Sequence, residues 1–351
     1  MRSQTQVSPD SSTEFHLTLG GGGSRATLAV TGGIAAFHKC GWTNWKSITV
    51  TSGGSVPGTF FAGHDNVKNI VRLALHTDFS QMVTPKVGKL KMLWAMLNKY
   101  RYEIQRPLEG VLSPELLKQF VNKGVPTWPQ NLIITGTDQD NQELLLTHKG
   151  VFRSPAGARL VETISDKPID LGTAVSISCA IPGIIDGTRA YGENMFDGGL
   201  GVEGQCPITP PQKLFGAKPE RIIAFDVGED HMKKDRLVRV LWYLTCRGAR
   251  CGPLEGYHPT EEDDGIILIA PNITGFNGLK FILNSMEKWG AIVCGYHATI
   301  ERLEKSELIS RETHREAFEI KDELEDLVRR VHNQKHCAKR IERLFRNHGM
   351  Y

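Results

Sequence analysis

Two glycine-rich turns near the N-terminus constrain the fold more than any other feature of the sequence. The first, Gly20–Gly23, follows an alternating apolar segment, Phe15–Leu19, and precedes apolar residues at helical spacing over Arg25–Cys40. Alternation predicts a strand and helical spacing predicts a helix. A turn between a strand and a helix directs backbone N–H groups and the positive helix end toward one point, where an anion can bind.

The same order recurs in the next segment of the chain. Ser47–Val50 predicts a short strand, Thr51–Ser55 a turn of small residues, and Val56–Ala62 the start of a helix with a proline in its first turn. Strands that alternate with helices predict an α/β fold with a largely parallel sheet. Further predicted strands, with helices expected between them, are Asn131–Gly136, Leu144–Thr147, Arg221–Val227 and Gly265–Ala270.

The first turn lacks the sequence motifs of nucleotide-binding loops. No Gly-Lys-Ser/Thr follows the glycines, and Gly-x-Gly-x-x-Gly is not satisfied, so nucleotide binding is disfavoured. A rigid group of N–H donors beside a second turn that exposes a serine suits acyl transfer, which must stabilise an oxyanion.

The second turn offers two serines. A nucleophile elbow needs small residues two positions before and two positions after the serine, because strand and helix approach closely there. Ser52 follows the strand directly and has Gly54 at plus two, although Val50 at minus two is larger than the usual glycine. Ser55 has Pro57 at plus two and lies at the helix start, where serine is a good N-cap. We favour Ser52 as the nucleophile.

A serine hydroxyl also needs a neighbour that accepts its proton. Asp197 immediately precedes Gly198 and Gly199, which let the backbone bend sharply and leave the carboxylate exposed in a pocket. By itself, Asp-Gly-Gly is more often an ordinary turn.

Together these segments resemble the patatin-like phospholipase family. The Gly-Gly-Gly-x-Arg/Lys loop of the family corresponds to Gly21–Arg25, its Gly-x-Ser-x-Gly elbow to Val50–Gly54, and its Asp-Gly-Gly/Ala motif to Asp197–Gly199. Similar segments are Ser178–Gly183 before the aspartate and Ile222–Val227 after it. The resemblance covers roughly residues 15 to 303, and the sequence departs from the family pattern at Val50 and at Ala26, where a glycine commonly stands.

The resemblance implies a three-layer α/β/α fold with a mostly parallel central sheet, and the helical pattern after Phe281 adds a C-terminal helical extension. The resemblance also implies an acyl hydrolase that releases fatty acids from phospholipids or lysophospholipids at a membrane surface, with a Ser–Asp dyad and no metal or organic cofactor. Ser52 would be the nucleophile and Asp197 the general base, and the amides of Gly21, Gly22 and Gly23 would form the oxyanion hole. The supporting residues would be Arg25, Gly54, Gly198 and Gly199. Arg25 would steady the loop, attract a phosphate head group, or form an ion pair at the surface.

Four alternatives remain open at this stage. A Ser-His-Asp triad would use His231 or His258, in the chain order of α/β-hydrolases. Asp138, Asp140 and Glu143 suggest calcium, but the EF-hand spacing is missing and a polar turn explains them better. The protein could also be an esterase or thioesterase for soluble acyl esters. A catalytically silent interaction protein of the same fold is the remaining alternative, and Val50 is its best support.

Composition sets the remaining expectations. The 42 Lys+Arg against 39 Asp+Glu of the 351 residues give a net charge of +3, which argues against nucleic acid as a partner. Seven scattered cysteines without a metal-ligand spacing predict reduced thiols in a cytosol-like compartment. We see no cleaved signal peptide and no membrane-spanning run, so we expect a cytoplasmic protein with peripheral membrane contact. Similar bacterial family members include effectors delivered into host cells, so export without a cleaved signal is compatible with the sequence.

The chain divides into three predicted parts. Residues 1–14 form a flexible tail, residues 15–303 the hydrolase domain with a helical insertion or lid at 66–127, and residues 304–351 a basic helical extension. In the extension, apolar residues recur four and three positions apart from Ile320 to Phe345, a seam that could pack on the same chain or on a second copy. The seam therefore leaves a homo-oligomer open, and the family resemblance leaves an activating partner open.

Overall fold

The computed structural model describes residues 14–64, 66–77, 82–97, 106–228, 258–273, 278, 280, 282–330 and 334–351. The predicted 1–14 tail, apart from residue 14, lies outside these ranges. The helices are α1 (Gly23–Lys39), α2 (Ser55–Ala62), α3 (Val67–His76), α5 (Lys89–Leu97), α7 (Glu115–Gly124), α8 (Leu171–Ser178), α9 (Thr209–Phe215), α11 (Glu261–Asp264), α12 (Ser285–Lys305), α13 (Arg315–Arg330) and α14 (Gln334–Asn347). Short 3-10 turns are η2 (Ser52–Gly54), η3 (Gly198–Leu200) and η4 (Pro219–Arg221).

The strands build one large sheet and one two-stranded ladder. They are β1 (His16–Leu19), β2 (Ser47–Val50), β3 (Thr84–Pro85), β4 (Leu112–Ser113), β5 (Leu132–Thr137), β6 (Glu143–Thr147), β7 (Gly150–Ser154), β8 (Glu162–Ser165), β9 (Thr188–Ala190), β10 (Glu193–Asp197), β11 (Ile222–Phe225) and β12 (Ile267–Ile269). The order in the large sheet is β12-β11-β1-β2-β5-β6-β7-β8, and β3 pairs with β4. The two predicted strand-turn-helix units are confirmed as β1-α1 and β2-α2.

The centre of the sheet is parallel and one flank is antiparallel. Strands β12, β11, β1, β2 and β5 run parallel, as predicted, whereas β5 to β8 form an antiparallel meander. The prediction of a helix between Asn131–Gly136 and Leu144–Thr147 is therefore wrong. Only five residues separate β5 from β6, whereas a parallel crossover needs about a dozen or more, so the chain turns back as a hairpin.

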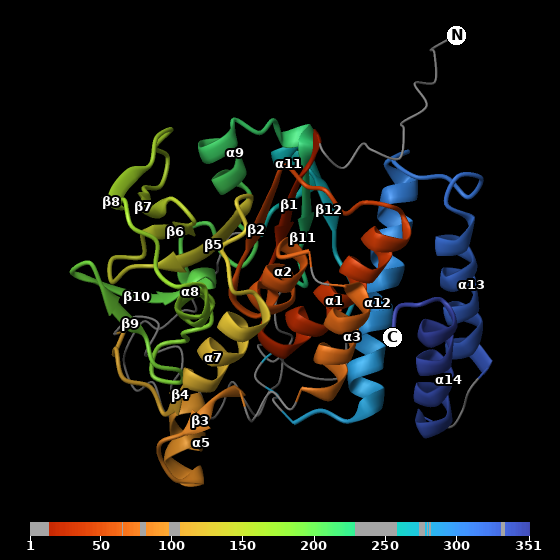
Figure 1. Cartoon of the computed structure of the whole chain (residues 1–351), viewed down its shortest axis with the longest axis horizontal. Coiled ribbons are helices and arrows are strands. Elements are labelled where there is room, and N and C mark those ends of the chain that lie inside the picture. The colour runs from red at the N-terminus through yellow and green to blue at the C-terminus, as the bar shows by residue number, and fades with distance from the viewer. Residues whose placement is uncertain are drawn as a thin grey trace.

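The sheet is covered on both faces. Along β11, Ile223 and Phe225 belong to the main core, and Ile222 and Ala224 belong to a second cluster that includes Cys206. Successive residues of a strand point to opposite faces, so the two clusters lie on opposite sides of the sheet. Figure 1 shows α1, α3 and α12 side by side, with α13 and α14 beyond α12. This arrangement confirms the predicted α/β fold with helices on both sides of the sheet.

Helices α1 and α12 pack closely because both carry glycine at the crossing. A Cβ atom on Gly32 would lie 1.9 Å from the Ile292 carbonyl oxygen, and one on Gly295 would lie 1.9 Å from the Ala29 carbonyl oxygen. This close contact holds α1, whose first residue belongs to the glycine turn, firmly against the C-terminal helices.

The C-terminal seam is divided between two helices of the same chain. Helix α13 ends at Arg330 and α14 begins at Gln334, and both contact α12. Ile320 and Leu324 from α13, and Ile341 and Phe345 from α14, are buried in the main core. The seam thus packs within the chain. The exposed residues of α14 include Lys339, Arg340, Arg343 and Arg346, so its basic side chains form a solvated face.

The segment predicted as a helical insertion, 66–127, contains α3, α5 and α7 and the β3–β4 ladder, with residues 78–81 and 98–105 outside the described ranges. Its role as a lid stays a prediction, as do the domain boundaries. Among the helices in the described ranges, none combines the length and the apolar character needed to cross a bilayer.

Candidate active site

The sheet topology brings Ser52 and Asp197 together. Strand β2 pairs with β5 as far as Ile134, and the chain then turns at Ser52. Strand β10 pairs antiparallel with the next part of β5, where Asp197 lies opposite Gly136. Since β6 occupies the other edge of β5 over these residues, β2 and β10 share one edge and their ends meet. The elbow and the aspartate therefore converge although 145 positions separate them.

The contact between the two side chains is a direct hydrogen bond. Ser52 Oγ donates to Asp197 Oδ2 at 2.8 Å, and Asp197 Oδ1 accepts from the Gly199 amide at 2.8 Å. Ser52 and Asp197 are only 5% and 2% exposed. A carboxylate held in one rotamer by the Gly199 amide is positioned to receive the serine proton. Ser55, the rejected candidate, instead donates to the Ser52 carbonyl oxygen at 2.6 Å.

The backbone of Ser52 has the conformation of a nucleophile elbow. Its φ of 46° lies in the left-handed region, which non-glycine residues rarely adopt. The Ser52 amide donates to Ser178 Oγ at 2.9 Å, and the Cys179 thiol donates to the Ser52 carbonyl oxygen at 3.2 Å. These two contacts from the end of α8 hold the strained turn.

The atypical Val50 is accommodated by a glycine in the following helix. Val50 is fully buried, and a Cβ atom on Gly58 would lie 2.5 Å from Val50 Cγ1. The side chain that is larger than usual in the strand is therefore matched by a missing side chain in α2. In this way the elbow keeps its geometry without a glycine at the position two residues before Ser52.

The two glycine turns touch each other through their backbones. A Cβ atom on Gly53 would lie 2.1 Å from the Gly23 carbonyl oxygen, and one on Gly54 would lie 2.3 Å from the Gly20 carbonyl oxygen. A Cβ atom on Gly21 would lie 2.8 Å from Ser52 Cβ. Real Cβ atoms do not approach this closely, so the absence of side chains lets the first turn lie directly against Ser52.

The amides of the first turn are not equivalent, and the predicted oxyanion hole needs a correction. The Gly21 amide donates to the Gln205 carbonyl oxygen at 2.7 Å, so it is not free to bind an oxyanion. The amides of Gly22 and Gly23 donate to no residue in the described ranges. Gly22 is the N-cap of the 17-residue helix α1, so both amides lie at its positive end. Of the three amides predicted to form the oxyanion hole, those of Gly22 and Gly23 therefore stay candidates and that of Gly21 does not.

Arg25 is an internal tether. It is 2% exposed, and its guanidinium donates to the carbonyl oxygens of Val227 and Ile273, each at 3.2 Å. The predicted contact with a phosphate head group and the predicted position at the surface are therefore wrong. The buried cation ties the start of α1 to the loops after β11 and β12, which supports the expectation that it steadies the glycine turn.

The glycines after Asp197 are sterically required. A Cβ atom on Gly198 would lie 2.3 Å from Thr135 Oγ1, and one on Gly199 would lie 2.2 Å from Gln205 Nε2. Gln205 therefore contacts the aspartate turn with its side chain and the first glycine turn with its carbonyl. The sequence prediction missed this residue, because nothing in the segment after Gly199 marks it.

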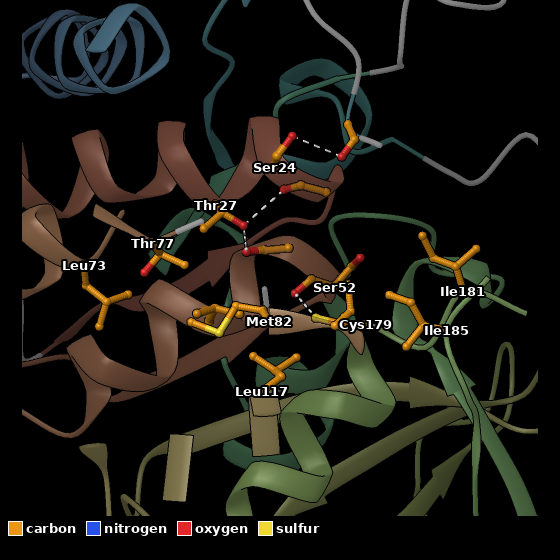
Figure 2. A pocket seen from close by; sticks show the side chains of 15 residues that line it. Ser24, Thr27, Ser52, Leu73, Thr77, Met82, Leu117, Cys179, Ile181 and Ile185 are labelled. Carbon is orange, nitrogen blue, oxygen red and sulfur yellow. Dashed lines mark hydrogen bonds between the residues drawn. The ribbon is translucent and has the colours of Figure 1, made fainter. Parts of the chain in front are cut away.

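An apolar pocket opens beside the serine. It holds about 690 Å³ of empty space, part of which is open solvent. Ser52, Gly23, Gly53 and Cys179 line one side. The apolar side chains that line the rest include Leu73, Met82, Val83, Leu117, Ile181 and Ile185, most of which are labelled in Figure 2. Such a pocket suits a hydrocarbon chain.

Cys179 does not compete with Ser52 as a nucleophile. Burial, and then the charge of Asp197, raise the pKa of its thiol to about 12, so the thiol stays protonated at neutral pH. A protonated thiol can keep donating to the Ser52 carbonyl oxygen. The sequence placed Cys179 in a segment of small residues, but gave it no role.

The other predicted candidates lie elsewhere. His258 Nδ1 is 2.7 Å from Asp226 Oδ2, and Ser52 contacts Asp197 directly, so no imidazole stands between serine and acid. His231 lies outside the described residues. Asp138 Oδ1 accepts the amides of Asp140 and Gln142, and its Oδ2 pairs with Arg153 at 3.0 Å, which confirms the polar turn. In the described part of the chain, no group of acidic, His and Cys side chains has the arrangement of a metal site.

Glu143 is buried beside the turn that follows Asp197. It is 1% exposed, its carboxylate accepts no hydrogen bond from a described residue, and a Cβ atom on Gly201 would lie 3.9 Å from its Cβ. Burial, and then the charge of Glu203, raise the pKa of Glu143 to about 8. The native state therefore binds one more proton than the unfolded state between about pH 4.5 and pH 8, so stability falls as the pH rises through this window.

We expect Glu143→Gln to remove the part of the pH-dependent loss of stability that Glu143 contributes. The free energy of unfolding should fall less between pH 5 and pH 8 in the variant than in the wild type, by about 1 to 3 kcal/mol. Urea unfolding at the two pH values measures the difference, and the exposed Glu220→Gln variant is the matched control. Parallel pH dependence in Glu143→Gln and wild type would show that Glu143 does not titrate in this range.

A family model matches the part of the chain that carries these motifs. The family model described as "Patatin-like phospholipase" matches residues 17–202, which contain both glycine turns and Asp197. No curated protein matches the sequence. A crystal structure of VipD from Legionella pneumophila is similar to the chain at 14% sequence identity and a TM-score of 0.48, covering 95% of this chain and 80% of that one.

Proposed function

Because the chain belongs to the patatin-like phospholipase family, we propose that it is a serine acyl hydrolase that releases fatty acids from phospholipids or lysophospholipids. The observation that carries this proposal is the 2.8 Å hydrogen bond between the buried Ser52 hydroxyl and Asp197, next to an apolar pocket and two open amides. These are the parts that ester hydrolysis needs: a nucleophile, a base, an anion site and a place for the acyl chain.

In the first half of the reaction, Asp197 Oδ2 takes the proton as Ser52 Oγ attacks the ester carbonyl carbon. The carbonyl oxygen becomes an oxyanion, which the Gly22 and Gly23 amides and the positive end of α1 stabilise. Each such donor contributes on the order of 3 kcal/mol to transition-state stabilisation. Collapse of this intermediate breaks the ester bond, and the alcohol leaves with the proton from Asp197, which leaves an acyl-Ser52.

In the second half, water gives a proton to Asp197 and attacks the acyl-serine carbonyl. A second oxyanion forms at the same amides, and its collapse returns the proton to Ser52 Oγ and releases the fatty acid. A carboxylate is a weak base toward serine in water, so the burial of both groups and their fixed geometry must compensate. The apolar pocket supports an acyl chain longer than that of an acetate ester.

Two measurements on the wild-type protein test the proposal. Phospholipid vesicles should yield free fatty acid, and a fluorophosphonate probe should label the peptide that contains Ser52. Hydrolysis of monomeric short-chain esters with no gain from vesicles would instead indicate an esterase for soluble substrates. Absence of both labelling and hydrolysis would indicate a catalytically silent member of the family.

A further inference from the structure

Helix α5 carries an apolar ridge, which we define as Leu90, Leu93 and Trp94. These side chains are 83%, 54% and 50% exposed. Their spacing of three and four residues places them on one face of the helix. Single exposed apolar residues are common in proteins, but three on one face of a nine-residue helix form a contiguous patch of the kind that marks an interaction surface.

The opposite side of α5 fixes the ridge to the rim of the pocket. Ala95 is 2% exposed and belongs to a small apolar cluster with Val83, Val111, Leu112, Ile184 and Ile185. Val83 and Ile185 also line the pocket beside Ser52. Figure 1 shows α5 at one end of the molecule, next to the β3–β4 ladder. The ridge therefore faces outward while the helix that carries it is packed on pocket-lining residues.

The positive charge of the segment that carries the ridge indicates an anionic partner surface. Residues 82–97 contain Lys86, Lys89 and Lys91 and no acidic residue. Lys86 pairs with Asp186 at 2.8 Å, and Lys91 is exposed. A short helix with Leu and Trp on one face and the exposed Lys91 beside them fits a bilayer with anionic head groups, since Trp and Leu enter the interface and lysine contacts the phosphates.

We propose that the apolar ridge of α5 docks the protein on anionic phospholipid bilayers and so brings the pocket to the membrane surface. This inference rests on the proposed function, because docking supplies lipid to the site beside Ser52. Docking itself requires no chemistry at Ser52, so the two proposals can be tested separately.

The test is sedimentation of the full chain with vesicles of phosphatidylcholine and phosphatidylglycerol. The variant Leu90→Ser, Leu93→Ser, Trp94→Ser should bind at least tenfold more weakly than wild type. Leu160→Ser is the matched control, because Leu160 is 81% exposed but lies between β7 and β8, and it should bind as wild type does. Wild type should also bind pure phosphatidylcholine vesicles more weakly, by about fivefold for each lysine that contacts the surface.

Two further readouts keep docking distinct from catalysis. Hydrolysis of a monomeric short-chain ester should be the same in the triple variant and in wild type, and thermal unfolding should show that the variant is folded. The docking proposal would be overturned if the triple variant bound vesicles as tightly as wild type does. It would also be overturned if wild type bound neutral and anionic vesicles equally. A change in oligomeric state without a change in vesicle binding would also overturn it, by showing that a second copy covers the ridge. Loss of binding in a protein that hydrolyses no ester would support docking and contradict the proposed function.

Discussion

Replacing Ser52 with alanine is expected to lower fatty acid release by about 10⁴-fold or more while the protein stays folded. The hydroxyl is the only group of Ser52 that the variant loses, and it donates to Asp197 at 2.8 Å. Without it no acyl-enzyme can form, and the anion site and pocket alone supply only the residual catalysis typical of serine hydrolases that lack their nucleophile. The rate of release from vesicles, with circular dichroism as the folding check, measures this effect.

The matched control is Ser55→Ala. Ser55 lies three residues away in the same turn and is also buried, but its hydroxyl donates to the Ser52 carbonyl oxygen and not to Asp197. We expect its activity to stay within about tenfold of wild type, because the loss of one such hydrogen bond costs about 1 kcal/mol. Activity above one tenth of wild type in Ser52→Ala would remove Ser52 from the mechanism.

Asp197→Asn should produce a loss of similar size. The asparagine oxygen can still accept the Gly199 amide, so the turn keeps its shape, but the amide nitrogen that faces Ser52 cannot accept a proton. Because nucleophile and base act as one unit, the double variant should be no slower than either single variant. Additive losses would indicate that Asp197 acts only on the structure of the turn.

Local sequence patterns predicted the parts of this site well. The glycine turns and Ser52 lie where a strand meets a helix, and such units are specified by residues that are neighbours in the chain. The motif around Asp197 was also visible. The sequence did not reveal how these parts meet, because β10 reaches the end of β2 only through its pairing with β5. The spacing of apolar residues within a strand does not predict which distant strand it pairs with, or in which register.

The two wrong predictions about the residues of the first glycine turn, Gly21 and Arg25, have the same origin. The Gly21 amide was assigned to the anion site because its motif contains it, but Gln205, which occupies that amide, lies 184 positions later. Two of the three roles predicted for Arg25 placed it at the surface or against a phosphate head group, yet it is buried against carbonyl oxygens from two distant loops. Both of these errors concern a hydrogen-bond partner that only the folded chain brings near, unlike the wrongly predicted helix between β5 and β6.

Gly53→Ala should show how tightly the two glycine turns must pack. The new methyl group would lie 2.1 Å from the Gly23 carbonyl oxygen, a backbone atom that cannot rotate away. The turns must separate, which moves Ser52 relative to the Gly22 and Gly23 amides. We expect a loss of about 2 kcal/mol in the free energy of unfolding, typical of overpacking, and a loss of about 10²-fold in kcat/KM from the misplaced nucleophile.

Gly290→Ala is the matched control for this substitution. Gly290 lies within α12, and apart from its chain neighbours and the nearby backbone of its own helix no atom lies within 4 Å of the position that its Cβ would occupy. Alanine is favoured over glycine in a helix, so this variant should be up to about 1 kcal/mol more stable than wild type and equally active. If Gly53→Ala behaved like Gly290→Ala in urea unfolding and in fatty acid release, the close contact of the turns would not be what aligns the nucleophile with the anion site. A loss of stability and activity in Gly53→Ala alone would instead show that the two glycine turns must touch to align Ser52 with the Gly22 and Gly23 amides.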